Sequence, residues 1–149
     1  MAYEGGGLIS LWKPDITTRS GAMSAMASAK FGFLIVGGFR LVMFIIGAGL
    51  SSLSGALASE PLVMWMVLAW FVIDIGLPFL AAYRLHLNQG AYVTPLATAT
   101  FVLSILLSLG IASIVAGVVF TGAFVSGARA AWAVKRGTGF DDDAIDIFA

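Results

Sequence analysis

The sequence has no cysteine, one histidine and little charge. Among its 149 residues, 11% are Asp, Glu, Lys or Arg, against about 25% in soluble domains. The lack of cysteine excludes disulfides, thiolate metal sites and cysteine nucleophiles. His86 has no second histidine with which to hold haem or zinc, so we expect no cofactor and no metal site. Eight basic and eight acidic residues balance to zero net charge, and this gives no sign of a nucleic-acid partner.

Catalytic motifs are also missing. There is no GxSxG motif, and Gly5–Gly7 is not followed by the Gly-Lys-Ser/Thr of a phosphate-binding loop. The Asp141–Asp143 run lacks the glycine and the distal glutamate of an EF-hand. We also find no repeat of the kind that many secondary transporters contain. The sequence therefore favours a protein that is not an enzyme.

Apolar residues are abundant instead, at 60% of the chain, with a mean hydropathy of +1.00. A soluble protein of this composition would expose large apolar patches, so the expected surrounding is a lipid bilayer. Charged residues such as Lys13 and Arg19 interrupt the first thirty positions, so no cleavable signal peptide is expected. We predict an all-α integral membrane protein.

The apolar stretches predict four transmembrane helices in an antiparallel bundle, at residues 31–55, 61–83, 93–109 and 111–134. No charge separates the last two, from Arg84 to Arg129. A single helix there would extend about 65 Å, over twice the hydrocarbon thickness. The alternative of three spans with one very long helix would keep one row of small residues on a single face: Thr100, Ser104, Ser108, Ala112 and Ala116.

Two segments flank the transmembrane bundle. Residues 1–30 are expected to form a cytoplasmic or interfacial segment. In it Pro14 breaks any earlier helix, and a helical lead-in capped by Asp15, Thr17 or Thr18 follows along the membrane surface. Residues 135–149 form an acidic tail, either a solvated end or a segment that docks on a partner. The residues that would dock are Phe140, Asp141, Asp142, Asp143, Ile145, Ile147 and Phe148.

The distribution of charge orients the four helices. Cytoplasmic segments carry an excess of Lys and Arg, and four spans place all peripheral basic residues on one side, with Glu60 on the other. Three spans would move the last three basic residues to the opposite side. We therefore expect both termini in the cytoplasm of a bacterial cell, with the protein in the inner membrane. The peripheral basic residues are Lys13, Arg19, Lys30, Arg84, Arg129, Lys135 and Arg136.

Arg40 and Asp74 each stand alone inside an apolar stretch. A charge within hydrocarbon costs about 2.5–3.5 kcal/mol on insertion scales, so each charge needs compensation. Arg40 lies nine residues after Phe31, and Asp74 lies nine residues before Tyr83, which puts them at one depth on antiparallel helices. We predict an intramembrane ion pair beside a kink at Pro78. Alternative roles for the two charges are contact with a partner subunit or lipid headgroup, and ion transport.

Small residues recur every fourth position at the end of the first stretch. Gly47, Ser51, Gly55 and Ser59 form a row that lets a second helix approach closely. We expect this helix-packing contact either within the chain or between subunits.

These features favour an accessory subunit or assembly factor that packs against larger membrane proteins, or against itself, within the lipid bilayer. The alternative is a small oligomeric transporter or channel that uses Asp74 as an ion- or proton-coupling site. An enzyme acting on lipid or quinone is the least supported reading, because no group of polar residues converges near one interface.

Overall fold

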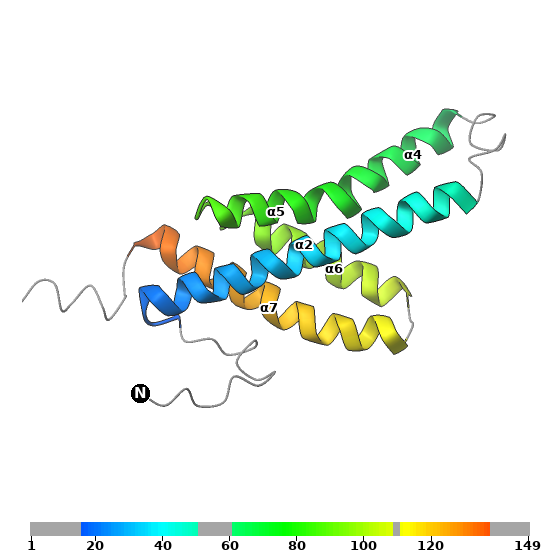
Figure 1. Ribbon diagram of the computed structural model, residues 1–149. Helices are drawn as coiled ribbons and strands as arrows, with labels where there is room; N and C mark the ends of the chain where they lie inside the picture. Colours follow the sequence, from blue (N-terminus) through cyan, green and yellow to red (C-terminus); the bar gives the residue numbers. More distant parts are fainter. Residues whose placement is uncertain (1–15, 51–60, 109–110, 138–149) are drawn as a thin grey trace, which may run out of the picture.

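The computed structural model describes residues 16–50, 61–108 and 111–137, which form antiparallel helices without a strand (Figure 1). The all-α fold class is therefore confirmed for these residues. A π-helical turn, η1, joins α4 to α5 without a loop, so residues 61–86 form one continuous helical rod. In chain order the elements are α2 (Arg19–Leu50), α4 (Pro61–Phe71), η1 (Val72–Gly76), α5 (Leu77–His86), α6 (Val93–Ser108) and α7 (Ile111–Arg136).

Two of these helices are long and apolar enough to cross a membrane. They comprise Arg19–Gly47 within α2 and Ile114–Arg136 within α7. The apolar stretch of α6, Val93–Leu107, is shorter. Length and composition thus support a membrane protein through two helices of the described chain.

α6 and α7 are separate helices that run in opposite directions (Figure 1). The rings of Tyr92 and Trp132 meet edge to face with their centres 5.4 Å apart. Nearer the middle of the bundle, Phe101 meets Phe124 at 5.0 Å. The chain therefore turns back between α6 and α7, and the alternative of one very long helix is wrong.

α2 begins at one of the helix caps expected from the sequence. The Thr18 hydroxyl accepts a hydrogen bond from the Gly21 N–H at 3.1 Å, which makes Thr18 the N-cap. The helix then continues for 32 residues, about 48 Å. Residues 19–30, expected as a helical lead-in, are continuous with the first predicted span and contribute to the core; their place along the membrane surface stays a prediction. Their buried side chains are Ala22, Ala25, Met26 and Ala29.

Gly47 is the one member of the expected small-residue row that the structure describes, and the row as a helix contact stays a prediction. A Cβ added at Gly47 would meet no atom within 4 Å, and Ser51, Gly55 and Ser59 lie outside the described residues. The close contact between α2 and α7 occurs much earlier along α2, where a Cβ added at Gly127 would overlap the Cβ of Ala29. The four-residue spacing identified a possible interface but not which half of α2 is packed within the chain.

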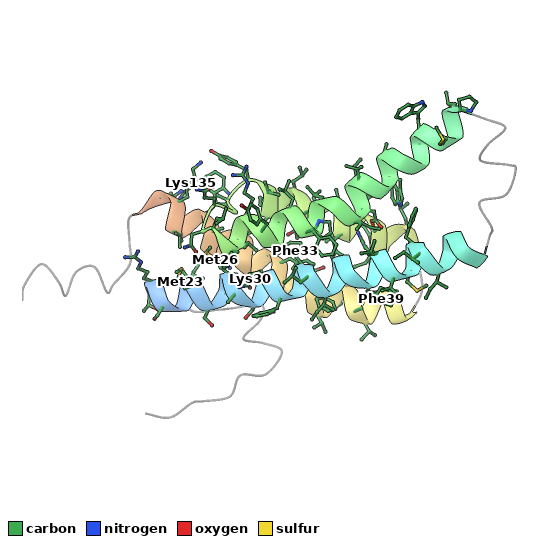
Figure 2. The ribbon with its side chains drawn as sticks, turned by 45° about the horizontal axis from the view of Figure 1, so that its top comes forward. Met23, Met26, Lys30, Phe33, Phe39 and Lys135 are labelled. Carbon is green, nitrogen blue, oxygen red and sulfur yellow. The ribbon has the colours of Figure 1, made fainter. Side chains whose placement is uncertain are left out.

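A cluster of phenylalanines fills the middle of the bundle. Phe33 of α2 and Phe124 of α7 are both 0% exposed, and their rings stack with centres 3.8 Å apart. Phe101 and Phe120 pack edge to face against each other at 6.4 Å beside that stack. Figure 2 shows Phe33 pointing into the space enclosed by the helices. This aromatic cluster holds α2, α6 and α7 together.

The second half of α2 and the whole of α4 are packed more loosely. Figure 2 shows the two helices diverging toward the end of α2 and the start of α4, and the main contacts of α2 are with α5, α7 and η1 rather than with α4. The diverging segments expose large apolar side chains: Phe39, Val42, Met43, Ile45 and Ile46 on α2, and Leu62, Trp65, Met66 and Trp70 on α4.

Candidate functional site

The structure brings Arg40 of α2 and Asp74 of η1 into contact where the two helices begin to diverge. One guanidinium nitrogen, Nη1 of Arg40, donates to the Asp74 carboxylate. The same nitrogen donates to the Asp74 backbone carbonyl at 3.0 Å. The side chains are 15% and 21% exposed, so the pair is largely, but not fully, enclosed.

Pro78 explains why the Asp74 carbonyl can accept this bond. In a regular α-helix, that carbonyl would accept from the N–H of residue 78, which proline lacks. Where the sequence predicted a kink, the rod contains the π-helical turn Val72–Gly76, a feature that is often found at functional sites. Arg40 thus supplies a donor to a carbonyl whose usual helical partner is missing.

Ser104 of α6 is the third polar residue of the cluster. Its hydroxyl donates to Oδ1 of Asp74 at 3.3 Å. The Arg40 guanidinium carbon also lies 5.5 Å from the centre of the Phe101 ring, within the range of a cation–π contact. From the sequence, Ser104 was expected only as a member of a row of small residues. Its depth on an otherwise uncharged helix antiparallel to α5 is the signal that points to Asp74.

A hollow of about 280 Å³ opens beside the ion pair. Arg40 and Asp74 form its polar part, and its remaining walls are apolar: Phe39, Met43, Phe44, Trp70 and Ile75. Because α2 and α4 diverge here, the hollow opens sideways, between the helices. The pair is neutral overall, so this arrangement suits docking of an apolar group that also presents a hydrogen-bonding atom.

Packing between α2 and α7 places one lysine and one arginine at the same height in the bundle. Ala29 faces Gly127 across the closest contact. Lys30 follows Ala29 by one position, and Arg129 follows Gly127 by two. The two residues therefore lie within about one helical turn of each other along the bundle axis. We call this height the basic level.

Arg84 lies at the same height on α5. Gly37 of α2 faces the ring of Phe79, and Arg84 is five positions beyond Phe79 toward the basic level. Along α2, Arg40 lies ten positions from Lys30, about 15 Å. The ion pair is thus well separated from all the other described charges.

Other residues singled out in the sequence do not join this cluster. His86 is exposed in the last turn of α5. Glu60 and the tail residues Phe140, Asp141, Asp142, Asp143, Ile145, Ile147 and Phe148 lie outside the described residues. Within the three described ranges, no three His, Asp or Glu side chains lie close enough together to hold a metal ion.

Comparisons of the chain with models of known protein families, with curated proteins and with solved structures found no match.

Proposed function

We propose that this chain is a small integral membrane subunit or assembly factor without enzymatic activity, which packs against another membrane protein at the hollow beside Arg40 and Asp74. The observation that carries the proposal is a partly exposed ion pair in a hollow that opens sideways from the bundle.

The spacing of charges supports a placement of the helices across the bilayer. From Lys30 to Leu50, α2 covers about 30 Å, equal to the hydrocarbon thickness. With the basic level at the cytoplasmic face, the rod of residues 61–86, α6 and α7 also cross, and both termini are cytoplasmic. Residues 19–29 and the end of α7 then project from the membrane on that side.

In this placement the ion pair lies near the middle of the hydrocarbon layer. A polar group that faces lipid at this depth has no water or headgroup with which to form hydrogen bonds. A helix from a second protein, seated between α2 and α4, would cover the pair and fill the hollow with packed atoms. Helices associate in lipid through packing and interhelical hydrogen bonds. The hollow offers an apolar surface for packing, and the ion pair offers hydrogen-bonding groups.

Site-directed photocrosslinking in intact membranes tests this proposal. A benzophenone side chain at Met43 or Trp70, both on the wall of the hollow, should crosslink to one defined membrane protein. Leu106 provides a matched control because it is an exposed apolar residue of α6 that does not line the hollow.

Three outcomes are distinguishable. A second membrane protein captured from both hollow positions and not from Leu106 supports an accessory subunit. A crosslinked dimer of the chain supports self-association at the same place. Lipid adducts alone, equal at all three positions, contradict the proposal.

A small oligomeric transporter or channel is the second candidate, favoured by the π-helical turn at Asp74. In that case Asp74 would bind and release a proton or cation while Arg40 changes partners. Ion flux into proteoliposomes that disappears in Asp74→Asn, and persists in Ser104→Ala, would support it. Absence of flux from the folded wild-type protein would exclude this candidate for the isolated chain.

A further inference from the structure

A second recess lies at the opposite end of the bundle from the divergent helices. It is a groove of about 570 Å³ between α6 and α7, at the end where the described chain begins and finishes (Figure 1). Pro95, Thr98 and Ala99 form its α6 wall, and Val125 and Trp132 form much of its α7 wall. Ile16, from the segment before α2, also lines the groove. Most of this α6–α7 groove is therefore apolar.

Two arginines give the α6–α7 groove its charge. Arg129 and Arg136 line it and are exposed. They are seven positions apart, which puts them on the same face of α7 with about 10 Å between their positions along the helix axis. The Arg136 guanidinium carbon lies 5.7 Å from the centre of the Trp132 ring. Asp74, the one acidic residue within the described ranges, is about half a bilayer away. The two cations thus have no carboxylate of the described chain near them.

The charged and apolar parts of the α6–α7 groove are separated by depth. Arg129 is at the basic level, and Arg136 is two turns farther toward the chain ends. Val125 and Ala99 are each about one turn deeper, toward the ion pair. A ligand that matches this order carries a negative group at one end and hydrocarbon at the other.

We infer that the α6–α7 groove binds one anionic phospholipid, with its phosphate at Arg129 and Arg136 and its upper acyl chain along Ala99 and Val125. Arginine pairs with phosphate through two parallel hydrogen bonds, and basic recesses between helices on the cytoplasmic side suit such headgroups. This inference rests on the membrane placement in the proposed function.

Fluorescence quenching by brominated lipids tests the inference. Trp132 lines the α6–α7 groove, so a full-length variant with Trp12, Trp65 and Trp70 replaced by phenylalanine reports on it alone. Reconstituted into phosphatidylcholine, it should be quenched by added phosphatidylglycerol brominated near the headgroup. The preference over brominated phosphatidylcholine should be roughly tenfold or more, as expected for two arginines near an anionic surface.

Arg129→Gln with Arg136→Gln should abolish that preference. The matched control is Lys30→Gln with Arg84→Gln, which removes two positive charges at the basic level and does not line the groove; it should retain the preference. Inorganic phosphate should not displace the quencher, since the acyl chain contributes to binding. Displacement by phosphate, or a preference that survives the double arginine variant, overturns the inference.

The chain's own acidic tail is the competing occupant. If preference for the anionic lipid arises only after Asp141→Asn, Asp142→Asn and Asp143→Asn are introduced together, the groove belongs to the tail and the lipid inference is wrong. A second single-tryptophan variant that keeps Trp70 separates the two proposals. Quenching of Trp70 by phosphatidylcholine brominated near the ends of its acyl chains shows that the protein is embedded, whereas no quenching of Trp70 by this lipid contradicts the membrane placement itself.

Discussion

The Cβ of Ala29 occupies the space that a side chain at Gly127 would need. This contact lets the backbones of α2 and α7 lie close together and sets the register between the two helices. Gly127→Ala should lower the free energy of unfolding in detergent by about 1–3 kcal/mol, the usual cost of overpacking. Gly38→Ala is the control, because its new methyl group would meet no atom within 4 Å. It should leave stability unchanged or raise it by up to about 1 kcal/mol through helix propensity; equal effects of the two changes would contradict the packing.

Removing the charge of Asp74 should destabilise the protein strongly. Asp74→Asn leaves Arg40 enclosed without a counter-ion, and we expect a loss of about 3 kcal/mol in the free energy of unfolding. Adding Arg40→Gln should restore part of it, with a coupling energy of about 1–3 kcal/mol in the double-mutant cycle. Additive losses would show that the two side chains stabilise the fold independently.

A change at Ser104 should have a smaller effect on stability than a change at Asp74. The Ser104 hydroxyl contributes a single hydrogen bond to Oδ1 of Asp74, so Ser104→Ala should cost about 1 kcal/mol. In the background of Asp74→Ala, the same change should cost less, because no side-chain oxygen remains at position 74 to accept the bond. An unchanged cost, measured by thermal unfolding in detergent, would mean that the hydroxyl does not act through Asp74.

Pro78→Ala should change the shape of the rod rather than the composition of the core. The new N–H can bond to the Asp74 carbonyl, compete with Arg40 and favour a regular α-helix across residues 72–76. Spin labels at Ile46 and Leu62 should therefore report a change of several ångströms in their separation. Pro95→Ala is the control, since Pro95 lies in the first turn of α6, where a missing N–H breaks no helical bond. It should leave that separation unchanged.

Topology can be measured with single cysteines because the chain has none of its own. Cysteines at Ser59 and Gly110 should react with an impermeant maleimide added outside intact cells. Cysteines at Ser20 and Leu87, exposed at the basic end of the bundle, should react only after permeabilisation. Labelling of the Ser20 position from outside would contradict the four-span placement with cytoplasmic termini.

The pairing of Arg40 with Asp74 could be predicted from the sequence, because it depends only on how many residues separate each charge from the end of its helix. An antiparallel connection between two apolar stretches puts Arg40 and Asp74 at the same depth, and burial of a charge requires a partner. The break near Gly110 followed in the same way from helix length and bilayer thickness. Both inferences use a constraint that acts along a single helix axis.

The sequence did not show which helix faces pack against one another, because several rows of glycine and alanine have the same spacing. Ala25 and Ala29 pack within the bundle, whereas the row that begins at Gly47 looked equally suitable. Choosing between them needs the rotation of each helix about its axis, and composition does not supply it. Ser104 was missed for the same reason: its distance along α6 was known, but not its facing toward Asp74.

The burial of residues 19–30 was missed for a different reason. Residues 19–30 are rich in alanine, serine and methionine and give a weaker hydropathy signal than the following stretch, so they looked like a surface segment. Their burial depends on α7, whose last turns provide the matching small residues Ala128, Ala130 and Ala131. The first turns of α2 are buried by a neighbouring helix, and the hydropathy of a single stretch of sequence does not reveal such a pairing.

The stacked rings of Phe33 and Phe124 also have a consequence for permeation. They lie between the basic level and Arg40, and Phe101 and Phe120 close the space beside them. Water or an ion entering along the bundle axis from the end where α2 begins would meet this aromatic barrier before it reached Asp74. Exchange of protons with the ion pair would therefore use the other side of this barrier, where the hollow between α2 and α4 adjoins the pair, and a partner seated in the hollow would control it.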